Sequence, residues 1–454
     1  MIVLLWTDIV ILGLLLLGLG YAWHVNRHPA LRATWRRVFA SPAAMGASVV
    51  LAAGFSLAVL DSLHFRPQLS GPGVVYDSRT WSVLDKLLGG LVEARETTYS
   101  APLAWQGFAK DAVEVDGVVQ RAYPRLQHGG AGLQRPAEQW AGDLASRAAV
   151  GLAGGAVVAG LGWLAFAAAL RRSGLPWRTG AAVFGVMALA GGVAVSLSQA
   201  YHVFGTDRTG NDVLVQALKS VRTAFVIGSL STLATLPLAV GLGIAAGYFK
   251  GWVDEVIQYL YTMLSSIPNV LLIAACVLMM QVFFDKNPEM FETAAERSDL
   301  RLFMLCAILG LTGWAGLCRL LRAETMKLRE LEYVQAAQAF GISHWRIMAR
   351  HIFPNVVHLM LITTVLDFCA LILYEAVLSY VGVGVDPSMS SFGGMINLAR
   401  SEMSRDPVVW WSFAAAFGFM VTLVLAANLF ADGVQDAFDP RARTFRPRLK
   451  PAKG

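Results

Sequence analysis

The chain has 454 residues, of which 56 % are hydrophobic and only 15 % are charged, and its mean hydropathy is +0.54. This composition lies outside the range of soluble globular proteins and indicates a membrane protein. The net charge of +6 is explained below by the sorting of basic loops to one side of a membrane, so it does not indicate a nucleic-acid partner.

Nine largely apolar segments predict membrane-spanning helices, which need about 20 residues each. The backbone of a lipid-embedded chain must bond internally, and the apolar runs lack the alternation of barrel strands. The predicted fold class is therefore an all-α polytopic membrane protein. The expected spans are 2–22, 43–62, 148–170, 180–198, 223–247, 257–283, 302–321, 356–381 and 411–431. We expect the first to be an uncleaved anchor, because its positive charges follow the apolar run rather than precede it.

Basic residues lie in alternate loops. The loops 24–42 and 171–178 and the tail 441–454 are rich in arginine, whereas the loop 284–300 is mostly acidic. Loops rich in Lys and Arg stay in the cytoplasm, so we expect the N-terminus outside and the C-terminus inside.

The chain divides into five zones. They are 1–63, N-terminal transmembrane helices with a basic cytoplasmic loop; 64–146, an extracytoplasmic insertion; 147–200, two transmembrane helices; 201–440, a helical core containing the loop 322–355; and 441–454, a basic cytoplasmic tail. Within the insertion, the apolar spacing from Trp81 to Glu96 predicts a helix. The insertion is interpreted either as a cap over the extra helices or as a contact surface for an external protein.

The stretch Phe204–Leu214 predicts a turn followed by a helix cap. Asp207 and Asp212 bracket a glycine turn and are suited to capping the helix that follows. Contact with an external protein is the alternative role for this stretch, whose signature residues are Gly205, Thr206, Asp207, Gly210 and Asp212.

Two membrane-depth positions are candidates for a translocation path. Pro268, between Ser266 and Asn269, is expected to kink the sixth span and free carbonyl groups, with or without contact to a path. The eighth span carries Thr363, Asp367 and Glu375. Asp367 and Glu375 lie about 80° apart on a helix, so one face could hold both and meet a cationic substrate group. Structural pairing with a partner protein, or a headgroup-level position for Glu375, is the alternative.

The loop Leu328–Asn355 pairs two short helices. Glu332–Phe340 is expected to be helical, with Ala336-Ala337 forming a patch without bulk. Gly341 follows where a left-handed residue ends a helix, and Ser343 is expected to cap a second helix that Pro354 interrupts. This arrangement suits docking into a groove of a partner protein, although an ordinary connecting loop has the same features.

The spacing of Ala336-Ala337, Gly341 and Pro354 resembles the "EAA" loop of bacterial ABC-importer membrane subunits. Two further stretches, Phe204–Leu214 and Gly247–Asp254, resemble GTDxxGRDVL and GYFGGWVD signatures, with Asn211 and Lys250 substituted. Together with Asn428–Gly433 near the C-terminus, they resemble the C-type permease of dipeptide, oligopeptide and nickel importers.

The resemblance implies a permease subunit that forms half of a translocation path for di- or oligopeptides in the bacterial inner membrane. Its implied partners are a second homologous permease, two ABC ATPase subunits, an extracytoplasmic substrate-binding protein and membrane lipid. The implied coupling-loop residues are Glu332, Gln335, Ala336, Ala337, Gly341 and Pro354; Gln335 stands where the family has glutamate. No GxxxxGK[ST] phosphate loop occurs in this chain, so ATP and Mg are expected on the partner subunits and no enzyme activity here.

Three other classes of protein are alternatives to this interpretation. An intramembrane enzyme is not supported, because HExxH and GxSxG motifs are absent and Gly382–Asp386 misses a GxGD spacing by one residue. An ion-driven secondary transporter would need no ATPase, and the 64–146 segment would also suit a signalling receptor. The four cysteines lie in apolar spans without metal-ligand spacing, so no metal site is expected.

Overall fold

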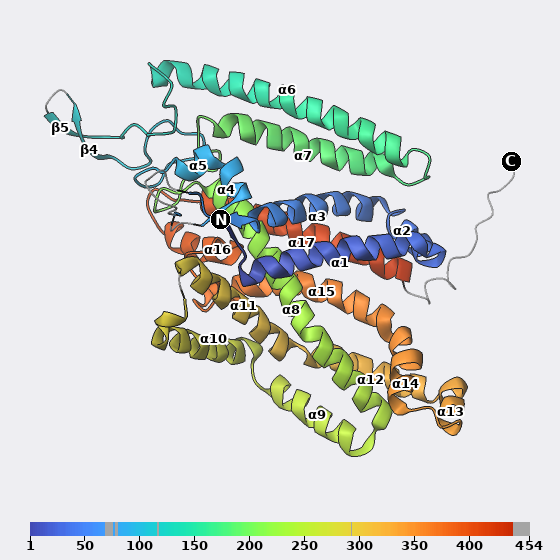
Figure 1. Ribbon diagram of the computed structural model, residues 1–454. Coiled ribbons are helices and arrows are strands. Elements are labelled where there is room, and N and C mark those ends of the chain that lie inside the picture. Colours follow the sequence, from blue (N-terminus) through green and yellow to red (C-terminus); the bar gives the residue numbers. More distant parts are fainter. Residues whose placement is uncertain (69–75, 78–79, 116–117, 292, 439–454) are drawn as a thin grey trace.

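The computed structural model describes residues 1–68, 76–77, 80–115, 118–291 and 293–438. Long helices lie side by side in an elongated bundle (Figure 1). The helices are α1 (Trp6–Arg27), α2 (Pro29–Val38), α3 (Pro42–Asp61), α4 (Val83–Leu87), α5 (Gly89–Glu93), α6 (Pro136–Leu170), α7 (Trp177–Ser198), α8 (Val213–Phe249), α9 (Gly251–Ser266), α10 (Asn269–Lys286), α11 (Ala294–Gly313), α12 (Ala315–Arg329), α13 (Glu332–Ala339), α14 (His344–Ile347), α15 (Phe353–Tyr380), α16 (Phe392–Glu402) and α17 (Trp411–Phe438). A 3-10 turn (Pro288–Met290) precedes α11, and a π-helical turn (Met348–Ile352) joins α14 to α15. The tail 441–454 lies outside the described residues.

Within the described residues, nine helical segments are long and apolar enough to cross a membrane. This confirms the all-α polytopic fold class. The sixth expected span, 257–283, is wrong as one kinked helix, because α9 ends at Ser266 and α10 begins at Asn269. Pro268 has no backbone N–H and disfavours a helical residue before it, and Ile267 is accordingly extended (φ −90°, ψ 132°).

Short strands gather at one end of the bundle. β1 (Ile2–Val3), β2 (His64–Phe65) and β3 (Trp81–Ser82) form an antiparallel sheet in that order, and β4 (Asp111–Val115) pairs with β5 (Val118–Ala122). The N-terminal amino group also donates to the carbonyl of Arg66 at 2.9 Å. The chain therefore begins at the end that carries the insertion, and α2, α13, α14 and the turn between α6 and α7 lie at the other (Figure 1).

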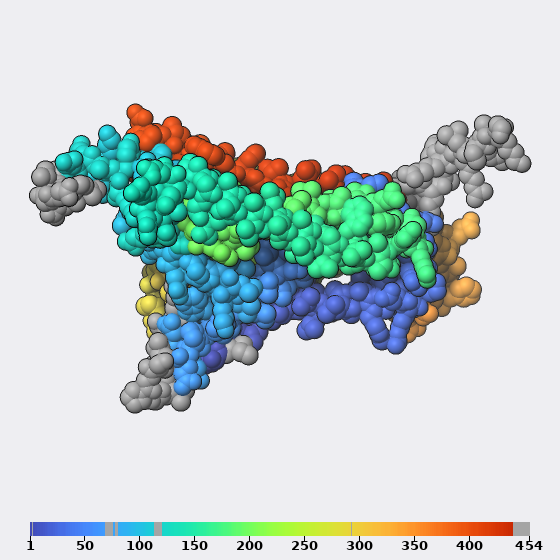
Figure 2. All heavy atoms as spheres, turned by 90° about the horizontal axis from the view of Figure 1, so that it is seen from above, coloured from blue at the N-terminus to red at the C-terminus, as the bar shows by residue number. Residues whose placement is uncertain are grey.

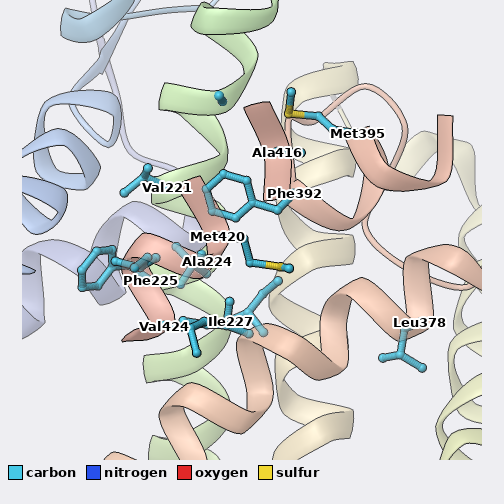
Figure 3. Close-up of a cluster of buried hydrophobic side chains, with 14 of the residues drawn as sticks. Val221, Ala224, Phe225, Ile227, Leu378, Phe392, Met395, Ala416, Met420 and Val424 are labelled. Atoms are coloured by element: carbon cyan, nitrogen blue, oxygen red, sulfur yellow. The ribbon is translucent and has the colours of Figure 1, made fainter. Parts of the chain in front are cut away.

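Among the described residues, two large hydrophobic clusters form most of the core, and a small third one joins Val38 and Ala44 to Val434 and Ala437 of α17. The larger one surrounds α8 and includes Phe225, Ile227, Phe392 and Met420 (Figure 3). The second lies toward α13 and includes Val334, Ala337, Tyr248, Leu321, Ile347 and Ile352. The loop between α12 and α15 is thus packed on the bundle.

The two extra helices α6 and α7 form a hairpin along the outside of the bundle (Figures 1 and 2). Glycines allow their backbones to approach closely: a Cβ on Gly192 would lie 2.5 Å from the carbonyl oxygen of Gly151. Val157 and Leu164 on α6 are about two-thirds exposed (64 % and 66 %), as expected for a face that meets lipid.

The insertion covers the core zone. The expected helix Trp81–Glu96 forms as the two short helices α4 and α5, and the Ser82 hydroxyl accepts from the Asp85 amide at 2.9 Å as the cap of α4. Tyr99 is buried in the main cluster, and Phe108 packs edge-on against Trp411 with ring centres 4.9 Å apart. The prediction of a cap over the extra helices is therefore incomplete: the insertion packs on the core through these aromatic side chains, and it also meets the extra helices, where Trp140 of α6 donates to the Leu103 carbonyl at 2.8 Å and His128 Nε2 lies 3.2 Å from the Ser198 carbonyl of α7.

Candidate functional site

The helix α13 is presented at the end of the bundle opposite the insertion (Figure 1). It begins after the extended residue Leu331 and ends at Ala339, and Gly341 follows with a left-handed φ of +73°. No heavy atom lies within 4 Å of where a Cβ on Gly341 would stand. Gly341 is therefore required for the backbone conformation of the turn, as the sequence predicted, and the space around it is open.

The outward face of α13 is more aromatic than the sequence suggested. Glu332, Gln335 and Ala336 are exposed, whereas Ala337 is buried (6 %) in the second hydrophobic cluster. The expected exposed patch of two alanines is wrong for Ala337, because adjacent helical residues point about 100° apart. The nearby side chains of Phe340 (85 % exposed) and Trp345 (77 %) complete this surface, which we call the α13 face: Glu332, Gln335, Ala336, Phe340 and Trp345.

Hydrogen bonds that the sequence did not indicate tie this loop to the turn between α8 and α9. The Tyr248 hydroxyl lies 2.8 Å from His344 Nδ1 and accepts from Gln338 Nε2 at 3.2 Å. Lys250 Nζ donates to Glu330 Oε1 at 2.7 Å. The partners are about 80 to 96 residues apart, so no local pattern could reveal them.

Two expectations about the second helix of the loop are wrong. The Ser343 side chain makes no cap hydrogen bond to α14. Pro354 does not interrupt the helical run, which extends from His344 to Tyr380. The π-helical turn changes the hydrogen-bond spacing directly before α15, and Pro354, which has no N–H to donate, stands at the second residue of α15.

A cavity of about 460 Å³ opens at the break between α9 and α10. The candidate path residues Ser266, Pro268 and Asn269 line it, together with Thr312 and Ala315 from the junction of α11 and α12. Two interrupted helices thus face one cavity. Carbonyl groups freed at such breaks are tolerated at membrane depth only where protein or water meets them.

The two carboxyl groups of the eighth span lie in different surroundings. Asp367 is half-buried, and Thr363 bonds back to the carbonyl of Leu359 at 3.0 Å. Glu375 is buried (4 %) and accepts hydrogen bonds from three groups within the chain. These are Ser379 Oγ at 2.6 Å, Ser391 Oγ at 3.0 Å and the Gly393 amide at 3.2 Å. Glu375 therefore holds the start of α16 against α15, and in this structure it does not share a conduit-facing surface with Asp367.

The stretch 204–214 forms the predicted turn and cap. Asp212 Oδ1 accepts from the Val215 amide at 3.0 Å, and Asp207 accepts from the amides of Thr209 and Asn211. Gly210 has φ +78°, and a Cβ there would lie 1.8 Å from the carbonyl oxygen of Glu96. Only glycine fits this position.

The insertion covers most of this signature. Thr206 is fully buried, and its hydroxyl accepts from the Ser100 amide at 2.6 Å. A Cβ on Gly205 would lie 2.4 Å from the Ser100 carbonyl oxygen. Direct contact of Gly205, Thr206, Gly210 and Asp212 with an external protein is therefore blocked, whereas Asp207 remains at the rim.

A buried charge cluster fastens the insertion to the core. His202 Nδ1 lies 2.7 Å from Asp212 Oδ2, and His202 Nε2 lies 3.6 Å from Glu96 Oε1. Burial alone would lower the pKa of His202, but the two carboxylates raise it to about 9. Burial alone would raise the pKa of Glu96, but His202 and the amides of residues 127–129 hold it at about 2. His202 and Glu96 are therefore both charged at neutral pH and stabilise one another.

A second buried cluster ties α1 to the core. The Arg222 guanidinium on α8 donates to Asp8 Oδ1 and Thr7 Oγ1 at 2.7 Å each, and lies 3.6 Å from Asp299 Oδ1 on α11. In the sequence, Asp8 stands alone as a charged residue within the apolar first span. Its partner lies 214 residues away, so only the fold reveals the pair.

Comparison with known proteins agrees with this architecture. Residues 239–444 match the family model described as "Binding-protein-dependent transport system inner membrane component". The chain is 31 % identical over 245 residues to the oligopeptide transport system permease protein OppC of Mycobacterium tuberculosis. The aligned region covers 54 % of this chain and 78 % of that protein. It is 30 % identical over 243 residues to the glutathione transport system permease protein GsiD of Pectobacterium atrosepticum (54 % and 74 %). It is 29 % identical over 243 residues to the dipeptide transport system permease protein DppC of Lactococcus lactis subsp. cremoris (53 % and 64 %).

The nine apolar helices and the matched core define a multi-pass membrane protein of the transporter-permease class. The chain belongs to the inner membrane components of binding-protein-dependent transport systems, as a C-type permease of the peptide-importer family.

Proposed function

We propose that this chain is the permease subunit of an ATP-driven importer of di- or oligopeptides, and that it docks on ATPase subunits through the α13 face. The observation that carries the proposal is the exposure of Phe340 and Trp345 beside Ala336 at one end of the bundle. Large aromatic side chains in water at a membrane face mark a protein contact site. The relatives named as dipeptide and oligopeptide permeases support the substrate class.

The contacts of the loop suit the transmission of motion. A push on α13 would reach the turn between α8 and α9 through Tyr248 and the Lys250–Glu330 pair, and it would reach α15 through the continuous helical run from His344. Packed helices move as rigid bodies between discrete arrangements. ATP-driven closure of the partners would thereby switch the access of the path.

The path itself is proposed along the interrupted helices. Ser266, Pro268 and Asn269 line the cavity at the break between α9 and α10, and Thr363 and Asp367 lie on the long helix α15. A second homologous permease would supply the other half of the conduit. Glu375 serves the packing of α16 in this proposal, because the chain's own donors satisfy it.

The remaining parts of the assembly follow from the family. The partners would be two ABC ATPase subunits, which hold the ATP and Mg, and an extracytoplasmic binding protein at the end that carries the insertion. The arginine-rich loops lie at the α13 end (Figure 1), which supports a cytoplasmic α13 and an N-terminus outside the bacterial inner membrane.

The test is uptake of a labelled dipeptide by cells that carry Ala336→Asp. A buried charge at the proposed contact is expected to abolish uptake and to release the ATPase subunits on purification, while membrane insertion is unchanged. Ala141→Asp is the matched control, because Ala141 is exposed on α6 near the insertion. Normal uptake with ATPases still bound to Ala336→Asp would refute the docking surface, and uptake driven by an ion gradient without ATP would favour a secondary transporter.

A further inference from the structure

A cavity of about 530 Å³ lies at the end of the bundle that carries the insertion. Its walls come from α4 and α5, the start of α8, the end of α10, α11, and the segment between α15 and α16. This volume falls within the range of small-molecule sites. The wall made by Asp85, Leu91 and Arg95 lies outside the matched family region of 239–444, so the cavity combines the core with a segment that the family model does not include.

Both signs of charge line this cavity. Lys219 Nζ donates to Asp85 Oδ1 at 2.7 Å on one side, and Arg301 Nη1 donates to Asp386 Oδ2 at 2.6 Å on another. Burial alone would raise the pKa of each of these carboxyls, but Lys219 and Ser82 hold the pKa of Asp85 below its usual value, and Ser388 and Arg301 do so for Asp386. The carboxylates are therefore ionised at neutral pH.

The lining also offers unused hydrogen-bonding groups. Gln281 and Asn397 are half-buried in the cavity wall, and neither carboxamide has a hydrogen-bond partner within the described part of the chain. A half-buried carboxamide without a partner is stabilised by a ligand that bonds to it. Met280 and Met389 add adaptable apolar surface that would accept varied side chains.

We propose that this cavity is a binding site for a small zwitterion of dipeptide size. Its carboxylate would meet Lys219 and Arg95, its ammonium group would meet Asp386, and its peptide group would bond to Gln281 and Asn397. A ligand of one charge sign would be repelled by one part of the lining, whereas a zwitterion satisfies both. The inference deepens the proposed function, on which it rests, by assigning the permease its own substrate site.

The test is binding of Ala-Ala to the purified full chain in lipid nanodiscs, measured by saturation-transfer NMR titration. Ala-Ala is expected to bind saturably, and N-acetyl-Ala-Ala and Ala-Ala amide to bind about tenfold more weakly, because each cap removes one charge-assisted contact. The double variant Gln281→Leu/Asn397→Leu is expected to weaken Ala-Ala binding by about tenfold. The variant Gln134→Leu, an exposed amide of the insertion outside the cavity, is expected to bind like the wild type.

Two results would overturn the site: no saturable binding in the millimolar range, or equal affinity for Ala-Ala and its capped forms. The comparison of Ala-Ala with its capped forms uses the wild-type chain. A folding defect of the double variant therefore does not affect this comparison. Binding by the isolated chain reports on the cavity alone, whereas the ATP dependence of cellular uptake reports on the proposed function. The two proposals can therefore fail separately.

Discussion

The buried arginine on α8 gives the sharpest stability prediction. Arg222 binds Asp8 and Thr7 of α1, its Nε donates to Ser62 Oγ at 3.0 Å, and it lies close to Asp299 of α11. All of these side chains are at most about 5 % exposed. We expect Arg222→Met to detach α1 from the bundle, because methionine fills much of the space but neutralises neither carboxylate.

The magnitude follows from the number of charges left unpaired. Removing one partner of a buried ion pair costs about 3–5 kcal/mol, because the remaining charge stays in a low-dielectric interior. Arg222→Met leaves Asp299 without its cation and leaves Asp8 with only His64, whose Nδ1 lies 2.8 Å from Asp8 Oδ2, so we expect a loss within that range. Replacing all three with apolar residues (Asp8→Leu, Arg222→Met, Asp299→Leu) removes the unpaired charges, and we expect stability to return to within about 1–2 kcal/mol of the wild type.

The assay is equilibrium unfolding of the purified chain in mixed micelles, followed by helical circular dichroism. The control is Arg32→Met, an exposed arginine on α2, which is expected to change the free energy of unfolding by about 0.5 kcal/mol or less. A free energy of unfolding for Arg222→Met within about 1 kcal/mol of the wild type would refute the view that this cluster anchors α1. A triple variant that is less stable than Arg222→Met would refute the charge argument.

Three further outcomes are expected. Lys250 has φ 57° and ψ −168°, a backbone region that is nearly exclusive to glycine, so Lys250→Gly should raise the free energy of unfolding by about 1 kcal/mol despite the loss of the exposed Glu330 pair; lower stability would contradict this. Gly210→Ala should accelerate proteolysis of the insertion, because its Cβ would overlap the Glu96 carbonyl oxygen; an unchanged cleavage rate would show that the contact yields easily. The pKa of His202 is raised to about 9 and that of Glu96 is lowered to about 2. The His202 contribution is full below about pH 6.5 and is lost as pH rises through about 9, and the Glu96 contribution is full above about pH 4.5 and is lost as pH falls toward 2. Hydrogen-exchange protection of the insertion, corrected for intrinsic rates, should therefore fall between pH 7 and 10 in the wild type and change less in His202→Gln; equal pH profiles would contradict the assignment.

Local features of the fold were predictable from the sequence. The Asp212 cap, the left-handed turn at Gly341 and the helix Glu332–Ala339 each depend on residues within one turn of the chain. The apolar segments likewise gave the number of spans, because length and hydropathy set what can cross a bilayer. The helix break at Pro268 was predicted as a kink, since one proline does not show whether the neighbouring turn stays helical.

Contacts between distant segments could not be predicted. Nothing near Asp8 points to Arg222, and nothing near His344 points to Tyr248. The burial of Ala337 also depends on which face of α13 packs on the bundle. Such facts depend on tertiary packing, which no pattern within a single segment records.

The most direct test of the account is photo-crosslinking in native membranes with a benzoyl-phenylalanine introduced at Phe340, the most exposed aromatic side chain of the α13 face. The control position is Val157 on the lipid-facing side of α6. We predict an ultraviolet-dependent crosslink from Phe340 to a protein that carries a nucleotide phosphate loop, with a yield that changes on addition of ATP, and none from Val157. A Phe340 probe that crosslinks to no such protein, or that reacts with an extracytoplasmic one, would contradict the proposed coupling.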